Sequence, residues 1–554
     1  MIVKLDMRAL LAQQISAGLK RKSIQACSTW SREYRIMGKP FPGPWRTKFH
    51  PWADDMMDCE SEMMIGQKGA QLCFTEVALN KSFFQIDVRG NTVLYVLPTD
   101  SDASDFSSGR FDPALEMSEH LKGMFSDVKN IGHKRAGTAS LYVRGSRSRS
   151  KLKSIPAAVA MVDELEEMKQ ENIPLIWERM SGQPVTQSFL LSTPTVPDLG
   201  INEYFAMSTE EHWFFKCPCC GRHTELVFPE CLVITADSWS DPSIYDTHLI
   251  CKECKGILPH EAKYEFLSKR HGGNWVPSYT NRVARGFHVS QLYSSTVKPY
   301  VLAQSFLRGK ENPADEQEFW NSKLGLPHEA KGAKVTDSDI KSCIGSYTML
   351  PYGPSSGLIT MGVDVGSVLH VSIDQWFTRK GVADHYDVNM RHTRKCLKIL
   401  TVETFDELVT LFNDFNVVCG VVDANPETRK AKELCQRLMG YFWRCYYARG
   451  ITSREIVKDE DDYKVSVHRA SWLDMSLRRH MNKTCVLPRD TPEEYKENVK
   501  ALVRILEKDK NGNLVARYVK GTKPDHYAHA ANYSEIALRL ATSSGGSHNI
   551  EGIY

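Results

Sequence analysis

Three short apolar runs, each carrying an acidic residue at or near its end, constrain the fold of this chain most strongly. Residues 155–164 read IPAAVAMVDE, residues 358–366 read LITMGVDVG, and residues 417–425 read VVCGVVDAN. Continuous apolar runs of this length are typical of strands that are buried on both faces of a sheet. Because the first run lies far from the other two, the chain is expected to hold two separate α/β domains.

Composition sets the class of protein without identifying a partner. Hydrophobic residues make up 42% of the 554 residues, which is enough to bury several cores. Lys and Arg exceed Asp and Glu by 70 to 67, so any contact with a polyanion must be local. The longest apolar stretches fall short of the ~18 residues that a membrane helix needs. The charged opening residues argue against a signal peptide. Fifteen scattered cysteines favour reduced thiols in a cytosolic compartment.

The pattern along the chain predicts an order of domains. Strand-like runs at 92–97, 141–143, 159–162 and 188–191 alternate with helix-compatible segments at 71–81 and 165–170, which favours a parallel sheet. The expected organisation is a helical lead-in at 1–40, a first α/β domain at 41–204, a cysteine-rich insertion at 205–275, a return to the first domain at 276–330, a linker at 331–357, a second α/β domain at 358–540 and a flexible tail at 541–554.

A first candidate site is a phosphate-binding loop. Residues 64–76 read MIGQKGAQLCFTE, a turn leading into a helix expected to begin near Leu72. Backbone N–H groups at a helix start attract phosphates, Lys68 can reach their oxygens, and the Thr75 hydroxyl can hold Mg²⁺. The usual P-loop has Gly and Lys directly before this hydroxyl, where this chain has Cys73 and Phe74. An ordinary strand, turn and helix remains the alternative.

Two further strand ends support a nucleotide site. Asp163 and Glu164 follow an apolar strand, where P-loop enzymes place a magnesium ligand and a catalytic base. Ser192 and Thr193 follow another, where hydroxyl groups can sense the terminal phosphate. A basic loop lies between them and either is simply solvated, contacts DNA, or acts on the nucleotide of a neighbouring subunit. Its cations are Arg144, Arg147, Arg149, Lys151 and Lys153.

Two C-x₂-C pairs predict a structural metal site. Cys217 and Cys220 form the first pair, and Cys251 and Cys254 form the second. Two such pairs can bind one tetrahedral Zn²⁺ through four thiolates, which leaves no open position for catalysis. Cys219 is expected to be a bystander, whereas Cys231 and His223 are the competing ligands. A redox dithiol is the other interpretation, but it gives no reason for a second pair.

The C-terminal half presents acids on separate elements. Asp364 lies in an apolar strand whose neighbour, residues 369–377, alternates like a hairpin partner. Asp423 ends a second strand, and Asp525 stands at a helix start with His529 one turn later on the same face. Phosphodiester cleavage with two Mg²⁺ or Mn²⁺ ions needs carboxylates that converge in this way. Taken singly, each aspartate is equally compatible with a strand end or a helix cap.

The order of these motifs resembles a known family. The segments KGAQLCFTE, LYVLPTDSDASDF, VAMVDELEEM and FLLSTPTVPDLG resemble the ATPase half of the large terminase subunit of tailed bacteriophages, in its lambda-like type. In that type the lysine stands at the front of the phosphate loop, and a cysteine insertion follows the ATPase motifs. The C-terminal acids resemble the nuclease half of the same subunits. The resemblance implies that residues 41–204 and 276–330 form a P-loop ATPase domain, that 205–275 are a zinc-ribbon-like insertion and that 358–540 form a ribonuclease H-like nuclease domain.

The resemblance implies roles for individual residues. Lys68, Gly69, Gln71 and Thr75 would bind ATP with Asp163, Glu164 would be the base, Ser192 and Thr193 would couple hydrolysis to movement, and Trp45 and Arg46 would lie near the adenine. Asp364, Asp423 and Asp525 would hold the nuclease metals. His529 stands where many relatives have an acid, so its role as ligand, supporting group or proton shuttle stays open.

The resemblance also implies partners and a setting. These are double-stranded DNA, a small terminase subunit, a portal protein and further copies of the chain in a ring, in the host cytoplasm and without a membrane. Two other functions remain compatible with the motifs. One is a helicase-nuclease of a restriction or repair system, and the other is a zinc-ribbon DNA-binding scaffold with an inactive P-loop.

Overall fold

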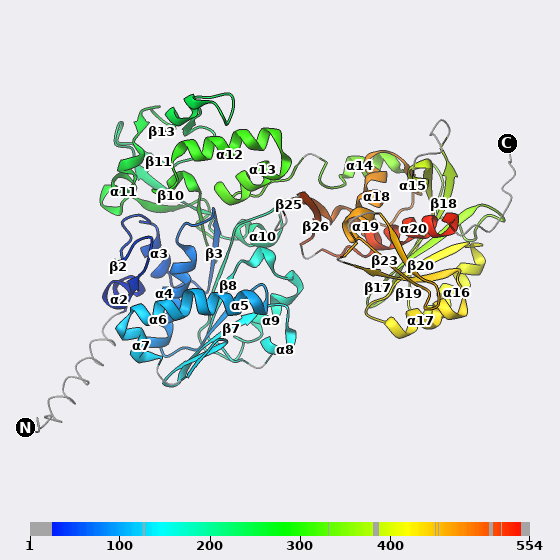
Figure 1. The fold of residues 1–554 in the computed structure, drawn as a ribbon, viewed down its shortest axis with the longest axis horizontal. Coiled ribbons are helices and arrows are strands. Elements are labelled where there is room, and N and C mark those ends of the chain that lie inside the picture. The colour runs from blue at the N-terminus through cyan, green and yellow to red at the C-terminus, as the bar shows by residue number, and fades with distance from the viewer. Residues whose placement is uncertain are drawn as a thin grey trace, which may run out of the picture. The chain divides into compact units, whose positions relative to one another are not determined.

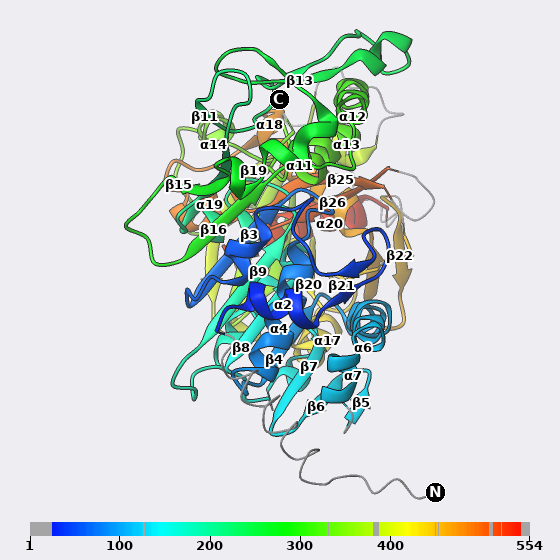
Figure 2. The same cartoon turned by 90° about the vertical axis from the view of Figure 1, so that its left-hand side faces the viewer.

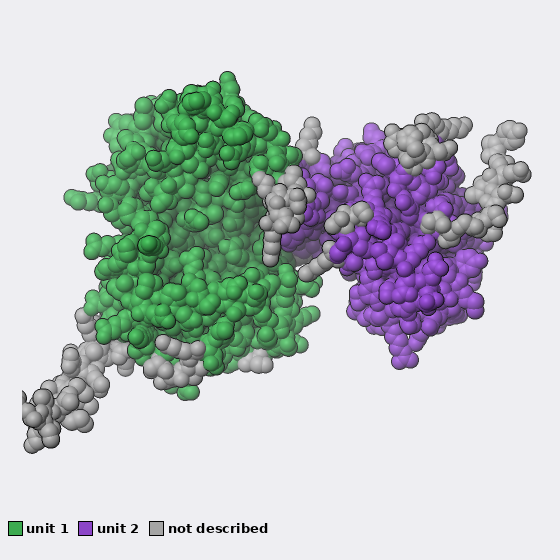
Figure 3. All heavy atoms as spheres, viewed as in Figure 1, with its two compact units in different colours: residues 1–329 green, residues 330–554 purple. Residues whose placement is uncertain are grey.

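A computed structural model describes residues 25–125, 128–153, 155–330, 332–379, 387–448, 450–451, 454–508, 514–521 and 523–543. The chain forms two compact units, Met1–Glu329 and Ala330–Tyr554, which Figure 3 distinguishes by colour. Most of the expected lead-in and most of the expected tail lie outside the described residues. The described part of the lead-in holds helix α2 (Cys27–Tyr34).

The first unit is built on an eleven-stranded sheet whose middle strands are parallel. Its path is β11-β10-β16-β3-β9-β8-β4-β7-β6-β5, with β15 paired to β10. Figure 2 shows β3, β9, β8, β4 and β7 following one another across the unit. The strands are β3 (Met63–Lys68), β4 (Val93–Leu97), β5 (Val128–Asn130), β6 (His133–Ala136), β7 (Ala139–Gly145), β8 (Val159–Asp163), β9 (Gln187–Ser192), β10 (Glu211–Lys216), β11 (His223–Thr224), β15 (Asn274–Pro277) and β16 (Arg285–Val289). The predicted parallel α/β sheet is confirmed.

Helices cover both faces of this sheet, and side chains alternate between them along each strand. Met64 of β3 and Met161 of β8 belong to the core beneath α4 (Phe74–Asp87), whereas Ile65 and Val162 belong to the opposite core. Figure 1 shows α4 and α5 (Asp100–Phe106) lying across the sheet. The α4 side also holds α6 (Asp112–Met117) and α7 (Glu119–Met124), and the other side holds α8 (Arg149–Leu152), α9 (Pro174–Trp177) and α10 (Gly200–Ala206).

One expected helix of the first unit is wrong. Residues 165–170 form short 3-10 turns, Leu165–Glu167 and Gln170–Asn172, in place of an α-helix. Glu164 adopts a left-handed backbone conformation with φ of 57°, which turns the chain sharply where β8 ends. The hydrophobic spacing that suggested a helix instead buries Leu165 and Met168 beneath the sheet.

The cysteine-rich insertion is a small β module. It contains the three-stranded sheet β12 (Leu232–Val233), β13 (His248–Ile250) and β14 (Ile257–Leu258), followed by α11 (Lys263–Phe266). Strand β16 then lies between β10 and β3 in the main sheet, so the chain after the insertion rejoins the first unit. Helices α12 (Pro299–Glu311) and α13 (Pro313–Glu318) follow it.

The second unit is built on an eight-stranded sheet with the order β22-β23-β21-β20-β17-β18-β19-β24. Strands β17, β18 and β19 are antiparallel to one another, while β20 and β21 run parallel to β17. This arrangement is ribonuclease H-like, as predicted. The strands are β17 (Leu358–Val365), β18 (Leu369–Thr378), β19 (His392–Val402), β20 (Cys419–Asp423), β21 (Phe442–Tyr447), β22 (Ile456–Asp459), β23 (Lys464–Val467) and β24 (Cys485–Val486), with a separate hairpin β25 (Val503–Lys508) and β26 (Leu514–Val519).

Helix α20 (His526–Ser543) lies against one face of this sheet, over β17 and β20. Gly362 permits the approach, because a Cβ atom there would overlap the backbone of Ala530 and Ser534. Helices α16 (Phe405–Asp414) and α17 (Thr428–Arg437) contribute to the core on the other face. The expected connector 331–357 supplies α14 (Asp337–Cys343), which packs on α18 (Arg469–Met481) in the second unit.

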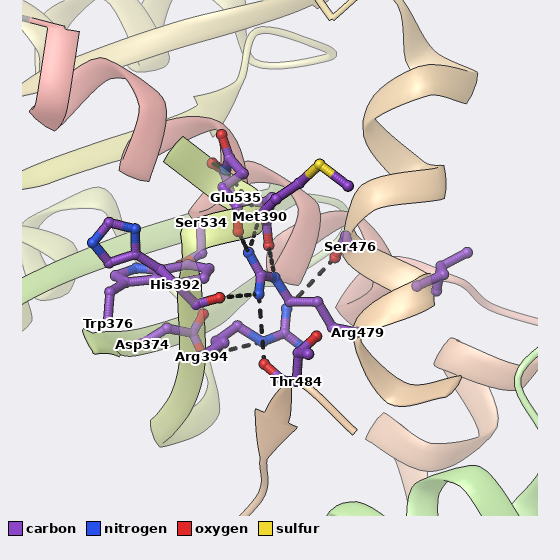
Figure 4. Close-up of polar contacts among 12 residues, drawn as sticks. Asp374, Trp376, Met390, His392, Arg394, Ser476, Arg479, Thr484, Ser534 and Glu535 are labelled. Carbon is purple, nitrogen blue, oxygen red and sulfur yellow. Dashed lines mark hydrogen bonds and ion pairs between the residues drawn. The ribbon is translucent and has the colours of Figure 1, made fainter. Parts of the chain in front are cut away.

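A buried ionic network fastens α20 to its neighbours (Figure 4). Arg479 of α18 donates to both carboxylate oxygens of Glu535 on α20, and its guanidinium also bonds the carbonyls of Asn389 and His392. Because Arg479 and Glu535 are both almost fully buried, water cannot solvate either charge in place of the other. The network therefore fixes the position of α20 along the sheet.

None of the helices in the described part of the chain combines the length and the apolar character that a bilayer crossing requires.

Candidate functional sites

The predicted phosphate site lies at one edge of the parallel sheet, where β3 and β8 end. Lys68 is the last residue of β3, and Asp163 is the last residue of β8. Both share the α4 side of their strands with Tyr95 of β4, whose hydroxyl donates to Asp163 Oδ2 at 2.7 Å. The Thr75 side chain lies near Asp163 and acts to lower the pKa of its carboxyl. Strand order and alternation thus bring these groups together from segments far apart in sequence.

Charge in this cluster is arranged around a buried carboxylate. Lys68 Nζ lies 3.6 Å from Glu164 Oε1, and the Lys68 side chain is buried while that of Glu164 is half exposed. Burial and the neighbouring Glu164 raise the pKa of Asp163 to about 6, against the opposing effect of Lys68. An ammonium group, a hydroxyl and two carboxylates are the groups that bind phosphates and Mg²⁺ and orient water. The residues therefore fit a magnesium nucleotide.

Phe74 takes no part in this cluster. Its ring is buried against Gly66 of β3, where a Cβ atom would stand 2.6 Å from the ring. The position that usually carries the phosphate-binding lysine is therefore a core position here, and Lys68 is the lysine that the fold offers. Helix α4 begins at Phe74, two residues later than predicted, and Cys73 before it is left-handed with φ of 76°.

The start of the loop is held by the protein itself. The Gly69 N–H donates to the Val289 carbonyl at 2.9 Å, and the Ala70 N–H donates to the Ser322 carbonyl at 2.7 Å. These two N–H groups are used internally, so a phosphate would meet the loop further along. Gln71 has a φ of 59°, which turns the backbone at that point.

A second carboxylate, the half-buried Glu166, was missed by the sequence reasoning and joins the ends of β8 and β9. Glu166 accepts hydrogen bonds from the backbone N–H groups of Thr195 and Ile201, both at 3.0 Å, and from the Thr195 hydroxyl. Its own N–H donates to Ser192 Oγ at 3.2 Å. Burial raises the pKa of Glu166 to about 7. The predicted coupling residue Ser192 is thus tied to the turn that carries Glu164, and Thr193 follows it at the strand end.

The other predicted residues of the first unit differ in their burial and in their partners. Trp45 is buried in the α4-side core with an unpartnered indole N–H, and Arg46 is exposed. In the basic loop, Arg144 donates to the carbonyls of Gly132 and Val143, so its cation is engaged within the fold. Lys151 pairs with Asp100 at 3.0 Å. Arg147, Arg149 and Lys153 are exposed.

The four predicted cysteines converge. The sulfur atoms of Cys217, Cys220, Cys251 and Cys254 lie within 4.8 Å of one another. Backbone N–H groups of Cys219, Glu253 and Gly256 each approach a sulfur of the cluster at 3.4 Å, as donors that stabilise thiolates. Cys231 lies outside the cluster and faces the Glu225 carbonyl, and His223 is exposed on β11. The donor set fits a tetrahedral ion bound by four thiolates.

Asp364 and Asp423 lie side by side in the second unit. Val363 of β17 is paired in register with Val422 of β20, so the aspartates that follow them are neighbours. Both occupy the face of the sheet that α20 covers. Burial raises the pKa of Asp423 to about 6, and the nearby charge of Asp364 adds to this effect. Two like charges held together in this way favour binding of a cation between them.

Asp525 is surrounded by cations. Lys520 donates to its Oδ1, and His529 Nε2 lies 3.2 Å from its Oδ2, with Arg469 at 3.8 Å. These partners hold the pKa of the Asp525 carboxyl well below its usual range, against the effect of burial. His529 also contacts the Tyr447 hydroxyl at 2.8 Å. The structure therefore places Asp525 beside His529 in an ionic cluster at the start of α20.

Two histidines that the sequence reasoning missed lie at Asp364. His526 Nδ1 is 2.8 Å from Asp364 Oδ2, and His370 stands opposite Asp364 in the β17–β18 register. Asp364, His370 and His526 form a group whose ligand atoms all lie within 4.8 Å of one another. The hairpin register was the one sequence signal for His370, since a three-residue turn after Val365 places residue 370 across from residue 364.

Together the fold and the sites define a P-loop protein fused to a ribonuclease H-like unit. Two family models match this chain: the ATPase domain of the phage terminase large subunit gpA, over residues 39–275, and the endonuclease domain of the same subunit, over residues 284–378. Together they cover more than half of the chain. The chain therefore belongs to the family of phage terminase large subunits, and the predicted resemblance is confirmed.

Individual relatives agree with this assignment. The terminase large subunit of Escherichia phage lambda is 20% identical over 332 residues, which cover 54% of this chain and 51% of that protein. The chain thus spans about half the length of this relative. The crystal structure of the large terminase of bacteriophage HK97 has a TM-score of 0.50 at 10% identity, over 92% of this chain and 98% of that one. At that identity the likeness shows the fold.

The endonuclease family model covers only some of the predicted nuclease residues. The endonuclease match ends at residue 378, so it includes Asp364 and His370 and stops before Asp423 and Asp525. Asp423 and Asp525 rest on the geometry described above. Family membership favours neither the helicase-nuclease nor the inactive scaffold that the sequence alone left open.

Proposed function

We propose that this chain is the motor and nuclease subunit of a viral DNA-packaging machine. It hydrolyses ATP in the first unit to drive double-stranded DNA into a preformed capsid, and it cuts concatemeric DNA with the second unit. The observation that carries the proposal is the convergence of Lys68, Thr75, Asp163 and Glu164 at one edge of the parallel sheet. Family membership supports both halves of the proposal.

In the first unit the residues divide the work of phosphoryl transfer. Lys68 donates to phosphate oxygens from the end of β3. Thr75 and Asp163 are the groups that would hold Mg²⁺, which supplies charge neutralisation at the phosphates when bound. Glu164, half exposed beside Lys68, orients the attacking water and accepts its proton. Glu166 links this turn to Ser192 and Thr195, so a change at Glu164 reaches the end of β9 directly.

In the second unit Asp364 and Asp423 are the central metal-binding carboxylates. They would hold Mg²⁺ or Mn²⁺, which would supply activation of the attacking water and stabilisation of the leaving oxygen of the phosphodiester. Asp525 orients His529, and Lys520 and Arg469 present positive charge from the same cluster to the DNA backbone. His529 is placed by Asp525 and the Tyr447 hydroxyl to hold or move a proton.

The proposal extends to the metal of the insertion and to partners. The four-cysteine cluster holds Zn²⁺ and stabilises the β module. Exposed Arg147, Arg149 and Lys153 contact DNA phosphates or the nucleotide of a neighbouring copy. As in the family resemblance, the partners are a small terminase subunit, a portal protein and further copies in a ring, in the host cytoplasm.

The motor half is tested by ATP hydrolysis of the full chain in the presence of double-stranded DNA. Lys68→Ala removes the phosphate-binding ammonium, and we expect a loss of turnover of about a hundredfold or more, because a charged group at the transferring phosphate is worth several kcal/mol. The matched control is Lys122→Ala, a change at an exposed lysine of α7, which should leave turnover unchanged. Equal turnover in wild type and Lys68→Ala would refute the assignment.

A second measurement separates packaging from strand separation. We expect wild-type protein with ATP to displace a third strand from a DNA triplex without unwinding the duplex beneath it. Unwinding of the duplex would contradict the packaging assignment and point to a helicase.

A further inference from the structure

We propose that Asp364, His370 and His526 hold one divalent transition-metal ion of the nuclease centre, and that the two imidazoles make this position prefer such an ion over Mg²⁺. The inference rests on the proposed nuclease function and deepens it by naming the ligands and the class of metal. Neither histidine was among the residues that the sequence indicated.

The first observation is geometric convergence from three elements. Asp364 lies on β17, His370 lies directly opposite it on β18, and His526 begins α20. Two ligands at ~2.1 Å from one cation and at right angles to each other are about 3 Å apart. His526 Nδ1 and Asp364 Oδ2 are 2.8 Å apart, which matches that spacing. The ligand atoms of Asp364, His370 and His526 all lie within 4.8 Å of one another.

The second observation is an unpartnered ring nitrogen. His370 is 4% exposed, and its Nδ1 is buried without a hydrogen-bond partner. A buried polar atom of this kind is costly unless something satisfies it. The other nitrogen, Nε2, lies 3.5 Å from Glu494 Oε1. Histidines that bind metals in proteins commonly have one ring nitrogen paired with a carboxylate and the other directed at the metal, and His370 has this arrangement.

The ligand types determine the class of ion. Mg²⁺ prefers oxygen ligands and keeps most of its water, whereas imidazole nitrogen is a better ligand for first-row transition metals. Asp423 lies on the other side of Asp364, next in register along the sheet. Asp364 can therefore contribute to two metal positions. One has oxygen ligands from Asp364 and Asp423, and the other has nitrogen ligands from the two histidines.

The test uses Mn²⁺ with the full chain, without nucleotide or DNA. Pulsed electron spin echo detects ¹⁴N nuclei bonded to Mn²⁺, and the thiolate cluster and the carboxylates of the ATP site supply no such nitrogen. We expect nitrogen coupling in wild type, a reduced signal in His370→Ala and in His526→Ala, and binding weakened by about tenfold or more in each. His271→Ala, at an exposed histidine of the first unit, should behave as wild type.

Several outcomes would overturn the inference. These are Mn²⁺ bound to wild type without nitrogen coupling, or coupling that neither histidine variant changes. His526 is half exposed, so its variant tests the site even if the buried His370→Ala fails to fold. His370→Asp replaces a nitrogen by an oxygen and should let Mg²⁺ compete with Mn²⁺ more strongly. Nitrogen coupling in a wild-type chain that cleaves no DNA would refute the nuclease function and leave the metal site standing.

Discussion

Phe74 occupies the position at which the usual phosphate-binding loop has a lysine. Its ring fills the space above Gly66, and the proposed phosphate-binding cation is Lys68 at the end of β3. We predict that Phe74→Leu lowers the free energy of unfolding by about 1–3 kcal/mol and leaves ATP turnover near wild type. Thermal unfolding and steady-state hydrolysis measure the two effects. A Phe74→Lys chain that folds stably and hydrolyses ATP faster would contradict this account.

Glu166 gives a prediction about pH. Burial raises its pKa from 4.5 to about 7, so the folded chain retains a proton here that the unfolded chain has released. This contribution to stability is complete below about 4.5 and is lost as the pH rises through about 7. Between about pH 5 and pH 8, the free energy of unfolding of the wild type should fall by up to ~3 kcal/mol relative to that of Glu166→Gln. If the difference in unfolding free energy between wild type and Glu166→Gln does not change with pH, the raised pKa of Glu166 is contradicted.

The four-cysteine cluster of the insertion leads to a prediction about its metal content and stability. Because four sulfur atoms converge, we expect about one zinc per chain by elemental analysis. Cys251→Ala should lose that zinc and destabilise the module. Cys219→Ser is the matched control, since Cys219 is exposed beside the cluster and outside it, and it should retain the metal. Full zinc content in Cys251→Ala would place the metal elsewhere.

Helix α20 depends on its ionic anchor. Glu535→Gln leaves the Arg479 guanidinium buried and only partly paired, so we expect the second unit to lose about 3–5 kcal/mol of stability. DNA cleavage should fall with it, because α20 carries His526 and His529. Glu433→Gln is the control, as its pair with Arg429 is exposed and contributes ~0–1 kcal/mol. Chemical denaturation compares the two variants, and similar small effects would show that the network does not hold the helix.

The elements that the sequence predicted well are those set by local patterns. Apolar runs marked β8, β17 and β20, and the C-x₂-C spacing marked the cysteine cluster, because each signal lies within a short segment. Contacts across the fold had no such signal. Glu166 is one of several acids that follow β8 in the sequence, and the N–H groups of Thr195 and Ile201 that donate to it come from about thirty residues further along the chain.

At the scale of the whole molecule, the proposed function assigns one kind of phosphate chemistry to each of the two α/β units. Their fold class and family could be predicted from the order of short motifs along the chain. The ligand sets could not, since His370 and His526 reach Asp364 through sheet register and helix docking. Asp525 stands at the start of α20 with His529 one turn later, as expected, but the ion pair between its carboxylate and Arg469 of α18 joins elements that are remote in sequence.

The central claim is that each unit has its own catalytic centre. The most direct measurement follows ATP turnover and Mn²⁺-dependent cleavage of plasmid DNA in wild type, Lys68→Ala and Asp364→Asn. We predict that Lys68→Ala loses turnover and retains cleavage, and that Asp364→Asn loses cleavage and retains turnover. Wild-type cleavage in Asp364→Asn, or wild-type turnover in Lys68→Ala, would contradict the account.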